Sequence, residues 1–277
     1  MPLSKRIIAR LDIKGSNLVK GVNLEGLRVL GKPENFAEYY YNNGADELYY
    51  QDVVASLYGK NSLKEIISKT AKNIFIPLTV GGGIRNLKDI SLILKYGADK
   101  VAINTAAIKN PLLIKKASKI FGSSTISVSI EASKVDNNYF AFTDNGRNNS
   151  KKKIIDWIKN VQDLGAGEII ITDIQLEGTG KGFNTELFEI INKFIEIPIV
   201  YNGGIGNVKQ ARNLFKKFQN ISGVSISSMF HYYCLNNQIF NNNKFEIGNI
   251  EYLDNRKKFD SFETHNISKF KKKLFKN

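Results

Sequence analysis

The chain has 277 residues, of which 42% are hydrophobic, with one cysteine and a formal net charge of +14. This length suits one α/β barrel, and a single cysteine excludes an internal disulfide framework and favours a reducing compartment. With no apolar run of 18 residues and no signal-peptide pattern, we expect a cytoplasmic protein without membrane contact. The lysines are scattered over predicted helices and a basic tail, which favours solvated faces and a small anionic substrate over nucleic acid.

Short apolar strands alternate with amphipathic helices along the chain. Strands are predicted at 7–12, 47–52, 76–80, 100–103, 125–131, 168–173, 198–201 and 223–226. Helices are predicted at 33–43, 62–73, 87–96, 111–121, 152–164, 185–194, 208–218 and 267–275, with an extra hairpin strand at 139–143. Eight βα units in this length predict a closed (β/α)8 TIM barrel. A doubly wound open sheet is the alternative, but no GxGxxG follows the first strand.

The first half of the sequence recurs in the second half. PLTVGGGIRNLKD at 77–89 is repeated, 121 residues later, as PIVYNGGIGNVKQ at 198–210. The repeat predicts two half-barrels, about 1–121 and 122–277, each of which alone would leave open sheet edges. We therefore expect a single barrel domain with pseudo-twofold symmetry and an extended tail from about residue 236.

Glycines and small polar residues follow the predicted strands at positions related by this repeat. They are Gly83, Asn104 and Thr105 in one half and Gly204, Ser227 and Ser228 in the other. Glycine turns and helix starts favour phosphate binding, so two anion sites are predicted on opposite sides of one mouth. Asp12 and Glu131 end the first and fifth strands between these sites and suit general acid–base chemistry. Each pattern alone is also typical of a plain βα turn or a loop cap, and the symmetry favours function.

Six segments together resemble the cyclase subunit of imidazole glycerol phosphate synthase, over about residues 4–232. They are KRIIARLDIKGSNLVKGVN, GADELYYQDVVAS, FIPLTVGGGIR, GADKVAINTAAIKNP, GAGEIIITD and EGTGKGFN. The resemblance implies a lyase of histidine biosynthesis without a cofactor. Such an enzyme uses ammonia to convert a bisphosphate formimino carboxamide ribonucleotide to imidazole glycerol phosphate and aminoimidazole carboxamide ribonucleotide. It further implies that Asp12 is the principal acid/base, that Glu131 occupies the second catalytic position, and that Lys20 and Gly178 join the substrate-binding residues.

The resemblance also implies a glutaminase partner that delivers ammonia at the N-terminal face of the barrel. The family guards this entrance with four charged residues, which in this chain are Arg6, Glu47, Lys100 and Glu168, and Asp99 matches a partner-facing position. A salt-bridged plug that only stabilises the bottom of the barrel is the alternative interpretation. Because apolar residues would avoid the desolvation cost, we expect a gate.

The chain departs from the family pattern at four positions. Glu131 replaces the usual aspartate, Arg10 replaces a small residue, and Gln175 and Glu177 replace aspartates after the sixth strand. Strand alternation places Arg10 on the face of Asp12, and we expect it to pair with Glu131 or Glu177. The departures leave two alternatives open, a paralogue that amidates a sugar precursor for surface polysaccharide and a non-catalytic barrel scaffold.

The two histidines and the tail carry little functional signal. His231, just after the eighth strand, is expected to pack or cap rather than to catalyse, and His265 is expected to be solvated. No His/Cys cluster has metal-ligand spacing, so we expect no metal. An Asn-rich stretch at 236–243 and a polar segment at 245–256 precede the closing helix.

Overall fold

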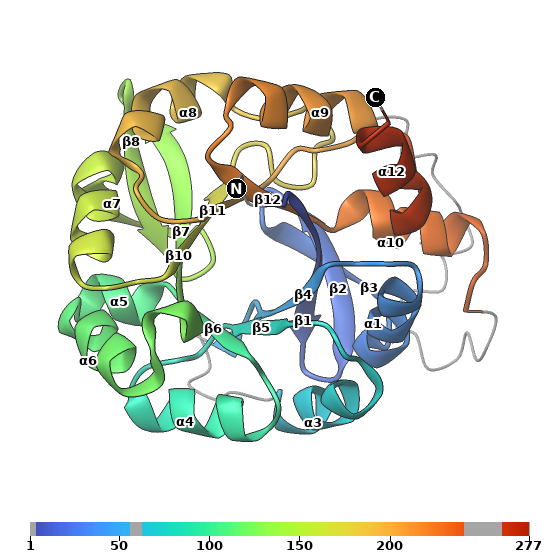
Figure 1. Cartoon of the computed structure of the whole chain (residues 1–277), viewed down its shortest axis with the longest axis horizontal. Helices are drawn as coiled ribbons and strands as arrows, with labels where there is room; N and C mark the ends of the chain where they lie inside the picture. Colours follow the sequence, from blue (N-terminus) through green and yellow to red (C-terminus); the bar gives the residue numbers. More distant parts are fainter. Residues whose placement is uncertain (1–3, 56–62, 241–261, 277) are drawn as a thin grey trace.

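Eight parallel strands close into a barrel in the computed structural model, which describes residues 4–55, 63–240 and 262–276 (Figure 1). The strands, in order around the barrel, are β1 (Arg6–Lys14), β4 (Glu47–Asp52), β5 (Leu78–Gly81), β6 (Lys100–Ile103), β7 (Ile126–Val135), β10 (Glu168–Asp173), β11 (Ile199–Asn202) and β12 (Ile221–Ile226). The β1–β12 and β7–β10 pairings join the two halves, so the sheet is closed and the predicted (β/α)8 fold is confirmed.

Helices surround the barrel on its outside (Figure 1). The main ones are α1 (Pro33–Asn42), α3 (Lys64–Asn73), α4 (Leu87–Lys95), α6 (Leu112–Phe121), α7 (Ile154–Asp163), α8 (Thr185–Ile191), α9 (Val208–Lys217), α10 (Ser228–Asn236) and α12 (Ile267–Leu274). Short turns of helix lie at α5 (Thr105–Lys109), η1 (Ser123–Thr125) and η2 (Asn192–Phe194). Most strand and helix positions predicted from the periodicity are confirmed to within two residues.

The internal repeat is visible in the way two helices begin. Asn86 caps α4 by accepting a hydrogen bond from Asp89 N at 3.0 Å, and Asn207 caps α9 by accepting one from Gln210 N at 2.9 Å. Asparagine is a favoured N-cap because its side-chain oxygen satisfies a free amide of the first turn. Equivalent residues of the two halves therefore start equivalent helices behind the two glycine turns.

Two hairpins extend the barrel strands beyond the mouth. The first consists of β2 (Asn17–Val22) and β3 (Glu25–Gly31), which were predicted as a loop, and the second of β8 (Asn138–Thr143) and β9 (Asn148–Lys153). Because β9 runs to Lys153, the predicted helix start at 152 is wrong and α7 begins at Ile154. The predicted strand at 139–143 is confirmed as β8.

The first hairpin bends over the mouth of the barrel. Asn23 and Leu24 form its tip with φ angles of 53° and 65°, which is the left-handed region that glycine normally favours. Leu24 is nevertheless buried, and Asn23 N donates to Glu177 O at 2.9 Å in the loop after β10. The strained tip is thus held by contacts across the mouth.

The closing helix predicted in the tail is confirmed as α12, whereas the polar segment predicted at 245–256 lies outside the described residues. The expectation that His265 is solvated is wrong. His265 is buried, and its Nε2 lies 2.9 Å from Glu263 Oε1 and 3.2 Å from Lys273 Nζ. The chain is held there because Glu263 N donates to Gly206 O at 2.8 Å, which packs the segment before α12 onto the barrel.

Within the described ranges, none of the helices combines the length and apolar character that crossing a bilayer requires.

Candidate active site

Asp12 lies at the C-terminal half of β1, where its side chain is buried inside the mouth of the barrel. Arg10 Nε donates to Asp12 Oδ1 at 2.8 Å, and Lys20 Nζ lies 3.7 Å from Asp12 Oδ2. Burial by itself opposes ionisation, but the charges of Arg10 and Lys20 outweigh it and hold the pKa of Asp12 below its ordinary value. Asp12 is therefore a carboxylate at neutral pH.

Arg10 points into the barrel, as strand alternation predicts, but the predicted partner is wrong. It pairs with Asp12, two residues further along the same face of β1, and not with Glu131 or Glu177. Each of those carboxylates is engaged elsewhere: Glu177 bonds to Lys20, and Glu131 accepts a backbone hydrogen bond from Gly146. The nearest acceptor on its own strand therefore takes the guanidinium.

Glu131 lies on β7 in an environment opposite to that of Asp12. Its Oε2 accepts a hydrogen bond from Gly146 N at 2.8 Å, and its side chain is buried. Burial raises the pKa of Glu131 to about 7, and the hydrogen bond from Gly146 and the charge of Arg10 offset only part of that rise. At neutral pH the mouth thus holds one ionised carboxylate and one carboxyl poised to give up a proton.

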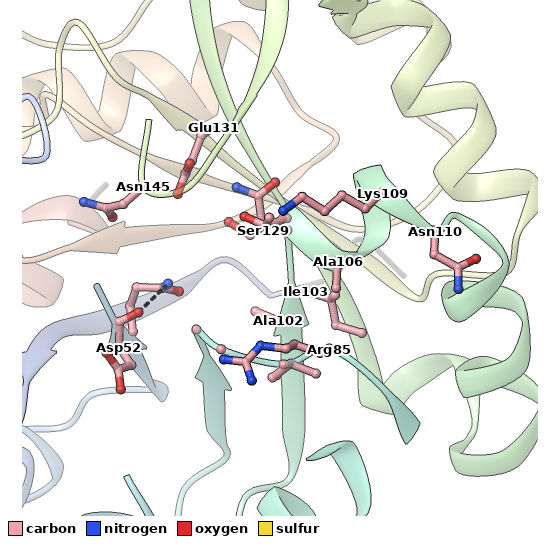
Figure 2. A pocket seen from close by; sticks show the side chains of 16 residues that line it. Asp52, Arg85, Ala102, Ile103, Ala106, Lys109, Asn110, Ser129, Glu131 and Asn145 are labelled. Atoms are coloured by element: carbon pink, nitrogen blue, oxygen red, sulfur yellow. Dashed lines mark hydrogen bonds between the residues drawn. The ribbon is translucent and has the colours of Figure 1, made fainter. Parts of the chain in front are cut away.

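A cavity of about 250 Å³ opens beside Glu131 in the first half-barrel (Figure 2). Gly83, Asn104 and Thr105, the anion-site residues predicted for this half, all line it, together with Glu131. Two cations not predicted from the sequence, Arg85 and Lys109, also line the cavity, as Figure 2 shows. Glycine, hydroxyl, amide and cationic groups around one cavity are the donors that a phosphate group requires.

The corresponding residues of the second half are also brought together. Gly204 follows β11, and Ser227 and Ser228 follow the neighbouring β12. The Oγ atoms of both serines are buried and have no hydrogen-bond partner among the described residues. The loop after β10 lies against Gly204, because Gly182 N donates to Gly204 O at 2.7 Å. Buried hydroxyls without partners indicate a place for a polar ligand.

Lys20 and Gly178, which the resemblance added to the substrate-binding set, lie where the first hairpin meets the loop after β10. Lys20 is buried on β2 and bonds to Glu177. A Cβ on Gly178, whose φ is 72°, would collide with Gly21 O, so glycine is required for this close approach. The Lys20–Glu177 ion pair was not predicted, although the replacement of aspartate by Glu177 marked the position.

His231 is buried on α10 behind Asp12, as expected of a packing residue. Its Nδ1 lies 2.5 Å from the hydroxyl of Tyr40, on which its ring stacks. Burial and the charge of Lys20 lower the pKa of His231 to about 3, so the imidazole is neutral. A neutral histidine adds no charge to the catalytic region.

The four predicted gate residues meet at the opposite end of the barrel. Arg6 bonds to Glu168 and, at 2.7 Å, to Glu47, while Lys100 Nζ lies 3.1 Å from Glu47 and 3.6 Å from Glu168. Each cation thus bridges two carboxylates, and charges of alternating sign form a closed ring. Thr79 Oγ1 also donates to Glu47 Oε1 at 2.5 Å. We refer to Arg6, Glu47, Lys100 and Glu168 as the charge ring.

An apolar layer fills the interior of the barrel between the charge ring and the mouth. Its members form a hydrophobic cluster separate from the outer core, and all are almost completely buried: Ile8, Tyr49, Ala102, Ile170 and Val200. A neutral molecule such as ammonia crosses such a layer at far lower cost than an ion.

In the described parts of the chain, no group of three His, Cys, Asp or Glu residues is arranged to hold a metal.

Comparison with known proteins gives a consistent set of relatives. The model of the family described as histidine biosynthesis protein matches residues 6–236. A relative from Legionella pneumophila, imidazole glycerol phosphate synthase subunit HisF, is 53% identical over 206 residues, covering 74% of this chain and 97% of its own length. Subunits with the same name from Staphylococcus saprophyticus and Sulfurisphaera tokodaii are 42% and 43% identical, covering 83% and 77% of this chain and 91% and 86% of their own lengths.

Proposed function

Because the chain belongs to the histidine biosynthesis family, among the HisF subunits of imidazole glycerol phosphate synthase, we propose that it is the cyclase subunit of such a synthase. The reaction combines ammonia with a bisphosphate formimino carboxamide ribonucleotide and yields imidazole glycerol phosphate, aminoimidazole carboxamide ribonucleotide and water. The observation that carries the proposal is the pair Asp12 and Glu131, two buried carboxyls of one mouth with different partners, Arg10 for Asp12 and the Gly146 amide for Glu131, and with pKa values shifted in opposite directions.

The chemistry needs both members of that pair. When ammonia forms two new C–N bonds, its nitrogen must lose protons, and an ionised carboxylate can accept them. The departing amine and the departing oxygen must each gain a proton, and a carboxyl with a pKa of about 7 can donate one. Asp12 is accordingly the general base and Glu131 the general acid.

The two polar sites place the substrate across this pair. One phosphate binds in the cavity of Gly83, Asn104 and Thr105, where Arg85 and Lys109 supply positive charge. The other binds at the hydroxyls of Ser227 and Ser228, which have no hydrogen-bond partner in the described part of the chain, beside Gly204. Lys20 and Gly178 belong to the hairpin and loop that cover the mouth over the reacting centre. A molecule gripped at both ends keeps its central group between the two carboxyls.

The charge ring is the entrance for ammonia, and a glutaminase subunit docks over it at the N-terminal face. The balanced ring and the apolar layer behind it support this assignment, because together they disfavour ions and admit a neutral molecule. Phe75 lies three residues before the start of β5, at this face of the barrel. Its side chain is 81% exposed and offers an apolar contact to the partner. We also infer that the protein is a single-domain barrel in the cytoplasm. A role in amino-acid biosynthesis and the free, buried Cys234 are consistent with this location.

The two alternative functions have less support. None of the relatives described above carries a name from surface polysaccharide synthesis. A non-catalytic scaffold would have no use for two buried carboxyls at the barrel mouth whose pKa values are shifted in opposite directions. The cyclase therefore accounts for the site best.

The proposal is tested with the purified chain, the formimino carboxamide ribonucleotide and an ammonium salt. We expect release of aminoimidazole carboxamide ribonucleotide, and glutamine to replace the ammonium salt only after a HisH-type glutaminase subunit is added. In cells, the gene should restore growth of a histidine auxotroph that lacks the cyclase. Absence of turnover with ammonia, together with failure to complement, would refute the cyclase assignment. Glutamine-dependent turnover without a glutaminase would refute the partner.

A further inference from the structure

Arg10 is a buried charge to which the proposed function assigns no role. It is 2% exposed, and its guanidinium lies 5.3 Å from the centre of the Tyr49 ring. Its NH1 lies 3.3 Å from Thr172 Oγ1. When the Asn202 amide is oriented to satisfy both of its ends, Asn202 Oδ1 also accepts from NH1 at 3.0 Å. Side chains from β4, β10 and β11 therefore hold the guanidinium in place inside the barrel.

The position of Arg10 in the barrel explains why it turns towards Asp12. Arg10 follows Ile8 on the inward face of β1, so its guanidinium lies between the apolar layer and the catalytic carboxylate. A buried guanidinium without an anionic partner costs several kcal/mol, and the apolar layer offers no anion. Asp12 Oδ1 at 2.8 Å supplies the partner. Because an Nε–H···O contact has a defined direction, it also fixes the plane of the carboxylate.

The other charged and titratable groups near Asp12 do not take this role. Lys20 lies 3.7 Å from Oδ2 and is bonded to Glu177 on the covering loop. On α10, His231 is neutral because its pKa is lowered to about 3, and on β4 the pKa of Tyr49 is raised by burial to about 12. On β7, Glu131 is the opposing acid. Arg10 is therefore the cation in direct hydrogen-bond contact with Asp12.

We propose that Arg10 is a positioning residue of this active site, which fixes the Asp12 carboxylate in one orientation and keeps it ionised through the reaction. Arg10 acts on the reaction through its hydrogen bond to Asp12 Oδ1. The inference rests on the proposed function for the identity of the reaction, but the contact between Arg10 and Asp12 is independent of it. In this chain a lysine would not substitute for Arg10, because it carries the charge without the planar, directed N–H group at Nε.

The test compares Arg10→Met and Arg10→Lys with the unmodified chain in ammonia-dependent turnover, with free ammonia held equal at every pH. For Arg10→Met we expect kcat/KM to fall about 100-fold near pH 6 and an acidic limb, absent from the parent, to enter the profile below about pH 7. For Arg10→Lys we expect kcat to fall, but the pH profile should show no acidic limb, as in the parent. Arg212→Met, which removes a guanidinium that caps α12, is the matched control and should keep the parent profile.

A second readout does not depend on turnover. The carboxyl ¹³C resonance of Asp12, assigned by its loss in Asp12→Asn, should titrate at a higher pH in Arg10→Met than in the parent. A profile lowered equally at all pH values, with an unchanged Asp12 titration, would overturn the proposal and leave Arg10 as a packing residue. If the parent fails to turn over the ribonucleotide while the titration shifts, the proposed function fails and the role of Arg10 stands.

Discussion

Strand β1 carries an arginine towards each end of the barrel, the half-buried Arg6 and the buried Arg10, and the two are used differently. Arg6 enters the charge ring, where each cation is shared by Glu47 and Glu168 and each carboxylate by two cations. Arg10 is committed to Asp12, while Glu131 receives a backbone amide instead of a cation. The two carboxylates of the charge ring thus have the same cationic partners, whereas the two carboxyls of the mouth have different partners.

The difference shows what the two regions are built to do. In the charge ring each charged group is paired with two groups of opposite sign. In the mouth the same side-chain chemistry is divided between a carboxylate with a lowered pKa and a carboxyl with a pKa of about 7. Such a separation of pKa values is how two carboxyls come to work as base and acid. Substitutions at either end can sharpen or break this contrast.

The largest effect is expected at the base. In Asp12→Asn the amide cannot accept a proton, so ammonia-dependent and glutamine-dependent kcat should both fall by about 10³-fold. Steady-state kinetics with each nitrogen source measures the loss, and Asp163→Asn on the exposed end of α7 is the control. A variant that keeps more than a tenth of the parent rate would exclude Asp12 as the base.

A smaller effect is expected at the acid. Because Glu131 must be protonated to donate, parent turnover at constant free ammonia should decline as the pH rises through about 7. Glu131→Gln should lower kcat about 100-fold and abolish that decline. If the decline persists in the variant, a group other than Glu131 is responsible for it.

The shifted pKa of Glu131 also predicts a pH dependence of stability. The folded state raises this pKa from 4.5 to about 7, so the group favours folding fully below about pH 4.5 and loses that contribution as the pH rises through 7. The free energy of unfolding of Glu131→Gln minus that of the parent should therefore increase by about 3 kcal/mol as the pH is raised from 4.5 to 8. Urea unfolding across this range measures the difference, and a constant offset would contradict the raised pKa.

The smallest of these effects is expected in the charge ring. Glu47→Gln leaves Arg6 and Lys100 with Glu168 as their shared carboxylate, and it should lower the free energy of unfolding by about 2 kcal/mol. Glutamine-dependent turnover should fall more than ammonia-dependent turnover, because ammonia from the glutaminase must pass the charge ring, whereas ammonia from solution can also enter through the mouth. Glu189→Gln, from a surface ion pair with Lys217, should change stability by less than about 0.5 kcal/mol. Equal losses with both nitrogen sources would reduce the charge ring to a structural plug.

Much of this arrangement could be predicted from the sequence, because it depends on period and symmetry. Alternation of strands and helices predicts the barrel, and the 121-residue repeat pairs Gly83 with Gly204 before any contact is known. The partner of Arg10 could not be predicted, since alternation gives the face of a side chain but not which of several carboxylates it reaches. His265 was misjudged because its burial depends on contacts with a distant loop.

The first hairpin was missed for a related reason. Its strands have few apolar residues in strict alternation, and its tip carries Asn23 and Leu24 in a left-handed conformation that sequence patterns reserve for glycine. The contacts that stabilise it come from the loop after β10, about 150 residues away in the chain. The hairpin over the mouth therefore depends on contacts between distant parts of the chain, whereas the barrel strands beneath it can be recognised from local sequence patterns.

The central claim is that the two carboxyls of the mouth titrate far apart, Asp12 below its ordinary pKa and Glu131 near 7. It is tested most directly by titrating the carboxyl ¹³C resonances of Asp12 and Glu131 in the full chain, with Asp12→Asn and Glu131→Gln for assignment. The account predicts a midpoint near pH 7 for Glu131 and an Asp12 that stays ionised below its ordinary pKa of 3.8. Ordinary midpoints for both groups, or the reverse order, would contradict it.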